Sequence, residues 1–378
     1  MKPILFNEPA ITGNELGFIK NLLESKQFSG LYFYEKKCQF LIKKLINANT
    51  VYLTPSGTHS LELAAMLINL KKNDEVIMPS YTFSSTANAF VLHGAKIVFI
   101  DVDKDTMNID LNKLEKAITK KTKAIVPVHY SGNSCDMKKL MKIAKKNNIY
   151  VIEDSAQAFL SKYNNKYLGN YGDIGCFSFH QTKNIHCSEG GAITINNPKL
   201  INRAEILREK GTNRSKFYRG EINKYNWVDI GSSYIPSEIS NAFLYGQLLN
   251  AKKITNHRIK LWKRYEKNLK ILSKNNLIKL NKISKNCKPN GHIFFIKLKN
   301  STERNNLIIF LKKHNVESTF HYIPLHSTRI GKKIGFFNGN DDFTSSESLK
   351  LLRLPLHYKL TDKEVDYVSK LIINFFTN

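Results

Sequence analysis

Residues 150–183 read YVIEDSAQAFLSKYNNKYLGNYGDIGCFSFHQTK, and in this stretch two apolar runs end on polar residues. The first run, Tyr150-Val151-Ile152, closes on Asp154, and the second, residues 176–179, leads to Lys183. Runs this short are typical of buried strands. Because the carboxyl ends of parallel strands meet at one edge of a sheet, we expect Asp154 and Lys183 to lie at neighbouring strand ends.

Short apolar runs alternate with helical patterns from about residue 50 to residue 200. In the helical segments apolar residues recur at spacings of three and four, as in Leu61, Ala64, Ala65 and Ile68. Strict alternation of this kind predicts an α/β fold, with a mostly parallel central sheet covered by helices on both faces. The expected strands lie at 51–53, 75–78, 96–100, 124–128, 150–152 and 176–179.

The pattern changes past about residue 240. A long helical stretch from Leu244 to Trp262 leads into a smaller α+β module, with an expected strand at 292–298 and a helix at about 303–314. A closing helix begins at the capping-box sequence TDKE, residues 361–364. The length of 378 residues suits about two domains. We expect a large α/β domain over residues 1–245 and a small C-terminal α+β domain over residues 246–378.

Composition and charge narrow the class of protein. Hydrophobic residues make up 42% of the chain and charged residues 24%, as in a soluble globular protein. No apolar run reaches the length of a signal peptide core or a membrane span, so we expect a cytoplasmic protein. The net charge of +27 would suit a protein that binds nucleic acid, but the lysines are spread in short pairs without a basic block or a known nucleic-acid-binding motif. We therefore expect no nucleic-acid partner, and a positive field suits an anionic diphosphate substrate.

Cysteine and histidine usage argues against metal sites and disulfides. The five cysteines are scattered without a C-x-x-C pair, and none of the eleven histidines stands in an H-E-x-x-H motif. We expect no metal ion. The cysteines are Cys38, Cys135, Cys176, Cys187 and Cys287.

A lysine beside an aspartate is what a pyridoxal 5′-phosphate (PLP) site requires. The lysine amine forms a Schiff base with the cofactor, and the carboxylate keeps the pyridine nitrogen protonated. Asp154 ends an apolar strand, so it needs a cationic partner to stay ionised, which a pyridinium supplies. Gln157 lies one helical turn further on and is placed to donate to the phenolic oxygen of PLP. A helix cap is the alternative role for Asp154.

Two further segments fit the same site. TPSGTHS, residues 54–60, joins an expected strand to a helix, and its small residues allow backbone N–H groups to approach a phosphate. An ordinary capped turn is the alternative. PSYTFSST, residues 79–86, follows the next strand and offers Phe83 as a residue that stacks on the cofactor ring, with core packing as the alternative.

Five motifs in this order and spacing resemble the DegT/DnrJ family of PLP-dependent sugar-nucleotide aminotransferases. They are SGTHS (56–60), PSYTFSSTANAF (79–90), VIEDSAQA (151–158), GCFSFHQTKN (175–184) and SEGGA (188–192). The resemblance covers essentially the full chain. It implies the fold type I of PLP-dependent transferases, which is that of aspartate aminotransferase, and a homodimer with shared active sites.

The resemblance also implies roles for individual residues. Lys183 forms the Schiff base and Asp154 binds the pyridine nitrogen, so both are expected to be catalytic. The other expected cofactor contacts are Gln157 to the ring oxygen, Phe83 over the ring, and Gly57, Thr58 and Ser178 around the phosphate. The expected substrate contacts are Ser29, Gly30, His186, Arg214, Tyr322 and His326.

The chain departs from the family pattern at two places. Relatives with a Gly-Tyr-Asn-Tyr-Arg segment use the Asn on a neighbouring subunit's phosphate, whereas this chain has GSSYI at 231–235. Ser233 is expected to take that role. Ser188 replaces the glycine that commonly precedes Glu-Gly-Gly.

Four segments are most similar to family members that make dTDP-4-amino-4,6-dideoxygalactose for lipopolysaccharide or enterobacterial common antigen biosynthesis: residues 95–110, 208–220, 229–234 and 320–326. The implied reaction transfers an amino group from L-glutamate to the 4-keto group of dTDP-4-dehydro-6-deoxy-D-glucose. The products are dTDP-4-amino-4,6-dideoxy-D-galactose and 2-oxoglutarate, and PLP passes through pyridoxamine 5′-phosphate.

Three alternatives remain. A sugar dehydratase on the same scaffold carries His in place of the lysine, and Lys183 argues against it. An aminotransferase acting at C3, or giving the gluco epimer, keeps the same chemistry on another keto sugar. A regulatory or nucleic-acid-binding protein that keeps the fold is consistent with the charge, but it has no need of Lys183, Asp154 and Gln157 together.

Overall fold

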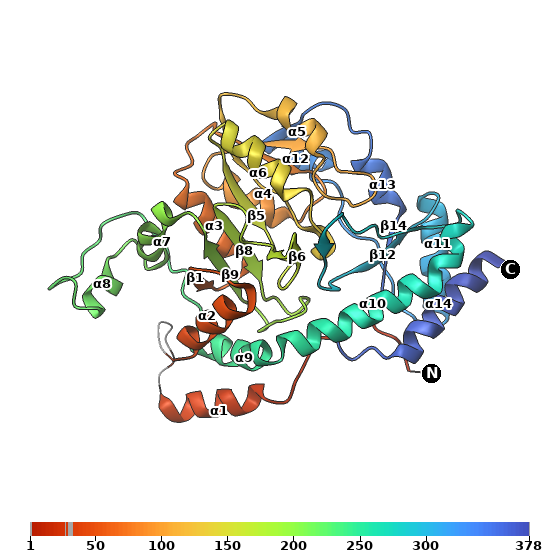
Figure 1. The fold of residues 1–378 in the computed structure, drawn as a ribbon, viewed down its shortest axis with the longest axis horizontal. Coiled ribbons are helices and arrows are strands. Elements are labelled where there is room, and N and C mark those ends of the chain that lie inside the picture. Colours follow the sequence, from red (N-terminus) through yellow and green to blue (C-terminus); the bar gives the residue numbers. More distant parts are fainter. Residues whose placement is uncertain (1, 27, 29–32, 378) are drawn as a thin grey trace.

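The computed structural model describes residues 2–26, 28 and 33–377, which form a large sheet flanked by helices and a smaller module beside it (Figure 1). The sheet has eight strands, and β9 runs antiparallel to both its neighbours while the other pairs are parallel. The predicted mostly parallel α/β sheet is confirmed. In spatial order the strands are β1 (Val51–Thr54), β9 (Gly191–Ile195), β8 (Ile174–Ser178), β5 (Tyr150–Asp154), β4 (Thr122–Ile125), β2 (Glu75–Pro79), β3 (Lys96–Ile100) and β13 (Gly335–Phe337).

Helices cover both faces of this sheet because successive side chains of a strand point to opposite sides. In β2, Val76 and Met78 join a core that includes Leu61, whereas Ile77 joins a second core that includes Leu140. The first core lies under α3 (Gly57–Leu67), α4 (Ser84–Val91) and α7 (Ile201–Arg208), and the second under α5 (Leu111–Ala117) and α6 (Met137–Lys146). Because both faces of the sheet are buried, its strands are apolar along almost their whole length.

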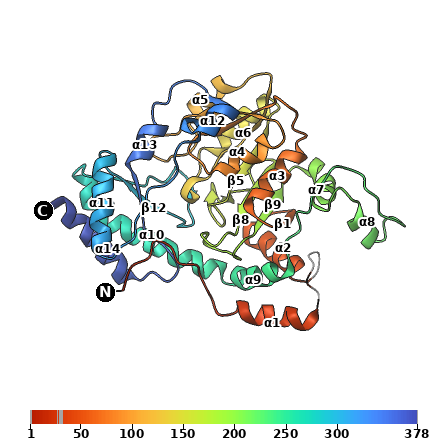
Figure 2. The ribbon, with the colours of Figure 1, turned by 180° about the vertical axis from the view of Figure 1, so that it is seen from behind.

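The small module is built on an antiparallel sheet of β10 (Lys279–Leu280), β12 (Phe294–Lys297) and β14 (Leu351–Leu354). Its core contains Trp262 and Tyr265 of α10 (Ala251–Lys274), together with side chains of α11 (Ser301–Lys313) and α14 (Asp362–Thr377). Helix α9 (Glu238–Leu249) leads into α10, which runs along the base of the molecule from one module to the other (Figures 1 and 2). Thr361 and Glu364 form the predicted capping box at the start of α14.

Two segments cross the expected division at residues 245/246. Ile4 packs in the core of the small module, and its backbone N–H donates to the carbonyl of Asn315. In the opposite direction, β13 pairs in parallel with β3 of the large sheet. The segment that contains β13 also contains η3 (Leu325–Ser327), α12 (Arg329–Ile334) and α13 (Thr344–Lys350). The division itself remains a prediction.

A segment that contains α8 (Arg214–Tyr218), Trp227 and Ile230 projects from the body of the molecule on the side opposite the termini (Figures 1 and 2). We call this segment the arm. Its apolar side chains are exposed, with Tyr218 63%, Trp227 76% and Ile230 74% accessible. The remaining elements are α1 (Glu15–Ser25), α2 (Phe33–Ile46), η1 (Tyr130–Gly132), η2 (Pro198–Leu200) and the small sheet of β6 (Lys162–Tyr163), β7 (Lys166–Tyr167) and β11 (Cys287–Lys288).

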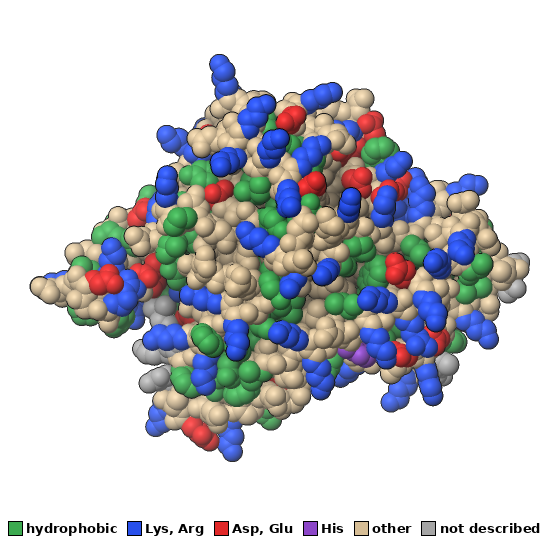
Figure 3. Space-filling model, viewed as in Figure 1, with side chains coloured by type: hydrophobic (Ala, Val, Ile, Leu, Met, Phe, Trp, Pro, Cys, Tyr) green, Lys and Arg blue, Asp and Glu red, His purple; other side chains and the backbone are tan. Residues whose placement is uncertain are grey.

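Lysine and arginine side chains are scattered over the face shown in Figure 3, with acidic side chains among them. Within residues 2–26, 28 and 33–377, no helix is long and apolar enough to cross a membrane. The same residues contain no cluster of three or more His, Cys, Asp or Glu side chains able to hold a metal ion.

Candidate active site

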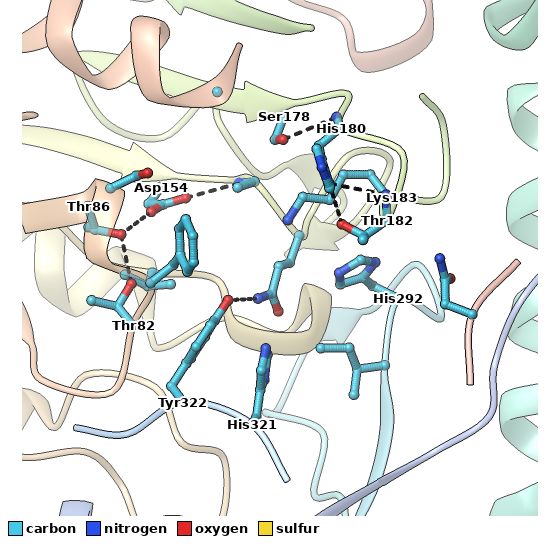
Figure 4. A pocket seen from close by; sticks show the side chains of 18 of the residues that line it. Thr82, Thr86, Asp154, Ser178, His180, Thr182, Lys183, His292, His321 and Tyr322 are labelled. Atoms are coloured by element: carbon cyan, nitrogen blue, oxygen red, sulfur yellow. Dashed lines mark hydrogen bonds between the residues drawn. The ribbon is translucent and has the colours of Figure 1, made fainter. Parts of the chain in front are cut away.

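A cavity of about 550 Å³ lies where the carboxyl ends of the central strands meet the small module. Figure 4 shows Asp154 and Lys183 on opposite sides of it, with His321 and Tyr322 on a third side. Its lining combines residues from the ends of β1, β2, β5 and β8 with residues from β14, from α10 and from the segment before η3. The fold therefore brings polar groups from distant parts of the sequence to one place.

Asp154 is the last residue of β5 and is 5% exposed. It accepts hydrogen bonds from the Thr86 hydroxyl at 2.7 Å and from the Ala156 backbone N–H at 3.1 Å. Thr86 in turn is hydrogen-bonded to Thr82 at 2.8 Å. Asp154 forms no ion pair with any described residue, so a buried carboxylate with free acceptor capacity faces the cavity.

Lys183 lies in the loop between β8 and β9, and its backbone N–H donates to the His180 carbonyl at 2.9 Å. β8 pairs with β5 so that Cys176 lies opposite Asp154, which confirms that the two residues follow neighbouring strand ends. Burial lowers the pKa of Lys183 to about 8, while the charge of Asp154 acts in the opposite direction. Roughly one-tenth of the amine is therefore neutral and nucleophilic at pH 7, far more than for an ordinary lysine.

The end of the cavity at the start of α3 is narrow. Gly57 lies so close to Ser178 that a Cβ atom on Gly57 would come within 2.8 Å of the Ser178 Cβ atom. Ser56 caps α3 by accepting from the His59 N–H, and Thr58 donates to the Ser85 hydroxyl at 2.8 Å. A helix N-terminus bordered by glycine and hydroxyl groups is well suited to a phosphate.

The middle of the cavity is bordered by aromatic and amide groups. Phe83 precedes α4 and is 57% exposed, which leaves its ring accessible to a flat ligand. The Gln157 amide accepts from the Ser131 N–H at 2.6 Å and donates to the Tyr322 hydroxyl at 2.9 Å. One hydrogen of the Gln157 NH₂ group has no partner in these contacts and is available to a ring oxygen.

Other predicted substrate contacts lie outside the cavity. His186 is buried, with its Nε2 donating to the Ala10 carbonyl at 2.7 Å and its ring against Phe243. It does not line the cavity because that contact turns the ring toward α9. Ser29 and Gly30 lie outside the described residues.

His326 also points away from the cavity. Its Nδ1 accepts from the Ser80 hydroxyl at 2.6 Å, and its Nε2 lies 3.1 Å from an Asp341 carboxylate oxygen. These bonds tie η3 to the end of β2, so His326 fixes the position of the neighbouring cavity wall instead of lining the cavity.

Arg214 and Ser233 are both on the arm side of this chain. Arg214 donates to the Tyr218 hydroxyl of its own helix, and Ser233 is an exposed residue whose backbone bridges to Glu209. Neither lines the cavity of the same chain.

Sequence reasoning missed several residues of the cavity wall. The Tyr130 hydroxyl is bonded to His321 Nδ1 at 2.8 Å, and burial, followed by the charges of Arg353 and Lys183, lowers the pKa of His321 well below its usual value. Arg258 of α10 also lines the cavity. No local pattern distinguishes His321 and Arg258, because they reach the cavity through the packing of the small module.

The residues present fit PLP. A buried carboxylate without a cationic partner, a lysine with a lowered pKa and a glycine in contact with a serine stand around one cavity with an exposed aromatic ring. Asp154 would hold the pyridine nitrogen, Lys183 the aldehyde carbon, Gln157 the ring oxygen, and Gly57 with Ser178 the phosphate. Since these groups come from four separate segments, the arrangement is specific.

Comparisons with known proteins agree with this site. The DegT/DnrJ/EryC1/StrS aminotransferase family model matches residues 9–372. The chain is similar to GDP-perosamine synthase of Escherichia coli O157:H7, with 30% identity over 381 aligned positions and 100% of both chains covered. It is 29% identical to the spore coat polysaccharide biosynthesis protein SpsC of Bacillus subtilis, covering 97% of this chain and 95% of that protein.

Solved structures show the same fold. DesV of S. venezuelae superposes with a TM-score of 0.90 at 24% sequence identity, with 100% of both chains covered. The predicted fold type I architecture is thereby confirmed. Spr1654 of Streptococcus pneumoniae, solved in a PLP form, is 26% identical with a TM-score of 0.87 and with 99% of this chain and 98% of that chain covered, and together with the family match it confirms the dependence on PLP. The protein belongs to the DegT/DnrJ/EryC1/StrS aminotransferase family and is a PLP-dependent aminotransferase.

Proposed function

We propose that this protein transfers an amino group from L-glutamate to the 4-keto group of dTDP-4-dehydro-6-deoxy-D-glucose, giving dTDP-4-amino-4,6-dideoxy-D-galactose and 2-oxoglutarate. The observation that carries the aminotransferase chemistry is the placement of Asp154 and Lys183 across one cavity. The choice of sugar rests on the resemblance of residues 95–110, 208–220, 229–234 and 320–326 to enzymes that make this product. The relatives named for GDP-perosamine and for a spore coat polysaccharide support a nucleotide-sugar substrate used in polysaccharide synthesis.

Bound PLP supplies an electron sink for the carbon that gains or loses a proton during transamination. The residues of this chain do the rest. Lys183 is a base near neutral pH because its pKa is about 8, so its Nζ carries the proton to and from C4 of the sugar. Asp154, held by Thr86 and by the Ala156 N–H, stabilises positive charge on the pyridine nitrogen.

The proposal includes a homodimer with shared active sites. The arm exposes Tyr218, Trp227 and Ile230, an apolar surface that a second copy would cover. Arg214 and Ser233 lie on the arm side and outside their own cavity, so they would act in the cavity of the other subunit. A cytoplasmic location is also part of the proposal and rests on the sequence-based expectation alone.

Shared sites are tested by subunit complementation. Lys183→Ala and Arg214→Ala variants are each expected to be inactive or strongly impaired, and mixing them after partial unfolding should restore up to about a quarter of the wild-type activity per dimer. Light scattering gives the mass of the assembly. No recovery from a mixture that light scattering shows to be dimeric would mean that each chain builds its site alone.

The substrate is tested by separating the two half-reactions. L-glutamate should remove the visible absorbance of bound PLP, and dTDP-4-dehydro-6-deoxy-D-glucose should then restore it. A GDP-linked 4-keto sugar and a dTDP-linked 3-keto sugar are tested beside it, with Lys183→Ala as the inactive control. Restoration by one of those sugars alone would move the assignment to another nucleotide or carbon. A protein that binds no PLP would favour a regulatory role for the fold.

A further inference from the structure

His292 lines the cavity on the side that holds Lys183, and one nitrogen of its ring is tied to the neighbour of that lysine (Figure 4). His292 Nδ1 lies 2.9 Å from the Oδ1 atom of Asn184, the residue that follows Lys183. The Asn184 amide nitrogen donates to the Asn290 carbonyl at 3.0 Å, so the amide oxygen is the atom that faces the imidazole. His292 Nδ1 therefore carries a hydrogen and donates it to Asn184.

The backbone of His292 is held in place as well. Its N–H donates to the Asn290 Oδ1 atom at 3.1 Å, and its carbonyl accepts from Arg258 at 2.7 Å. The Asn290 amide nitrogen in turn donates to the carbonyls of Gln157 at 3.0 Å and of Phe159 at 2.9 Å. These bonds join the segment before β12 to the loop after β5, so the imidazole has a defined position at the cavity.

The second ring nitrogen of His292, Nε2, is a hydrogen-bond acceptor. It has no hydrogen-bond partner within the part of the chain that the structure describes. The pKa of His292 is well below its usual value because of burial and then of the charges of Lys183, Arg258, His321 and Arg353. The ring is therefore neutral, with its hydrogen on Nδ1 and a lone pair on Nε2.

The amine of Lys183 has donors but no acceptor. Among residues 2–26, 28 and 33–377, its Nζ atom has no hydrogen-bond or ion-pair partner. Asp154 lies on the opposite side of the cavity (Figure 4). Glu189 also lines the cavity, but its carboxylate is exposed and lies 3.5 Å from His180. His292 Nε2 is thus an unused acceptor on the same side of the cavity as an unused donor.

We infer that His292 is a positioning residue for Lys183, whose Nζ donates a hydrogen bond to His292 Nε2 whenever the amine is not bonded to PLP. The lysine stem is flexible, so Nζ can move between the cofactor and His292 while the backbone stays in place. The bond keeps the free amine beside the carbon whose proton it carries. The inference rests on the proton-carrying role of Lys183 in the proposed function, and it does not depend on which sugar is the substrate.

The first test measures the pKa of Lys183 in cofactor-free protein, without turnover. Stopped-flow absorbance follows the attachment of PLP between about pH 5 and pH 10, and the midpoint of the rate profile reports that pKa. An ammonium group donates a stronger hydrogen bond than a neutral amine, so an acceptor at His292 favours the protonated lysine.

Three variants separate the acceptor from the rest of the side chain. His292→Asn keeps a donor toward Asn184 but is too short to reach Nζ, and it should lower the midpoint by about one pH unit. His292→Leu fills the space without any acceptor and should lower the midpoint in the same way. His292→Gln places an amide oxygen near the position of Nε2 and should restore most of the shift. The matched control is His257→Asn, which should leave the midpoint unchanged because His257 lies on α10 and does not line the cavity.

The second test follows the proton. In single turnovers with L-glutamate, His292→Asn should slow the loss of the visible absorbance of bound PLP roughly tenfold, because an amine that is not held spends less time within reach of the substrate carbon. L-glutamate deuterated at its α-carbon should react more slowly still in this variant, and His292→Gln should recover part of the rate.

Each outcome decides the role of His292. An unchanged midpoint in both His292→Asn and His292→Leu would overturn the inference, and a raised midpoint would mean that His292 is a cation beside Lys183 and would overturn it as well. A slower turnover without a deuterium isotope effect would place the defect outside proton transfer, which also contradicts a positioning role. If wild-type protein attaches PLP but does not react with L-glutamate, the proposed donor is wrong, and the midpoints alone decide whether His292 binds the amine.

Discussion

The pKa of Lys183 gives a prediction whose size follows from the structure. Only the neutral amine adds to the aldehyde of PLP. With a pKa of about 8, roughly one-tenth of the Lys183 amine is neutral at pH 7, against about 0.03% for an ordinary lysine of pKa 10.5. The covalent attachment of PLP to cofactor-free protein should therefore be about 300-fold faster at pH 7 than this chemistry would be with an unperturbed lysine.

The pKa of about 8 for Lys183 also determines how the rate of PLP attachment changes with pH. Below pH 8 the attachment rate should rise about tenfold per pH unit, and above pH 8 it should level off. Stopped-flow absorbance between pH 6 and pH 10 measures this profile. N-α-acetyl-lysine is the control, because its reaction with PLP should keep rising to about pH 10.

Two variants should move the midpoint in opposite directions. The charge of Asp154 raises the pKa of Lys183, so Asp154→Asn should lower the midpoint below 8. The charge of Arg353 lowers that pKa, so Arg353→Gln should raise the midpoint. A wild-type midpoint near 10.5, or shifts of both variants in the same direction, would refute this electrostatic description of Lys183.

The remaining predictions concern stability and the cavity wall. Arg208→Met removes the cation of the buried ion pair between Arg208 and Glu35 and should lower the free energy of unfolding by about 3–5 kcal/mol in urea titrations; a loss below 1 kcal/mol would show that the pair is dispensable. Thr361→Ala removes the cap that is shared with Glu364 and should cost about 1 kcal/mol by the same measurement, whereas no change would mean that α14 does not depend on it. His326→Ala removes the side-chain bond from η3 to Ser80, while the backbone bond from Leu325 to the Ser80 carbonyl stays, and should lower single-turnover rates about tenfold with PLP affinity kept. An unchanged single-turnover rate would show that the cavity wall beside η3 keeps its position without the His326 side chain.

Local patterns predicted the large module well. The run Lys96–Ile100 was expected as a strand and forms β3 with the same bounds, and Tyr150 begins β5 as expected. Residues 124–128 were expected as one strand, but β4 ends at Ile125. Pro127 has no N–H to continue the ladder, although Val128 returns to a bridge with Asp154.

The small module contributes to the cavity in ways that no local pattern shows. β13 reaches β3 across more than 200 residues, and its short sequence has no strand-like alternation. The sequence does not distinguish Arg353 from the other members of its 58 lysines and arginines. Only the packing of β14 in the structure shows that Arg353 lines the cavity. Lys183 and Asp154 were predictable because Asp154 ends one buried strand and Lys183 follows another, whereas His326 was misplaced because its bonds to Ser80 and Asp341 depend on the tertiary fold.

The most direct test of the proposed function follows the nitrogen itself. The protein is mixed with PLP, ¹⁵N-labelled L-glutamate and dTDP-4-dehydro-6-deoxy-D-glucose, and the sugar product is examined by NMR. The account predicts a ¹⁵N atom bonded to C4 of the sugar, in the galacto configuration, with an equal amount of 2-oxoglutarate. Label at C3, the gluco configuration, or no label in the sugar while 2-oxoglutarate forms would contradict the proposed substrate.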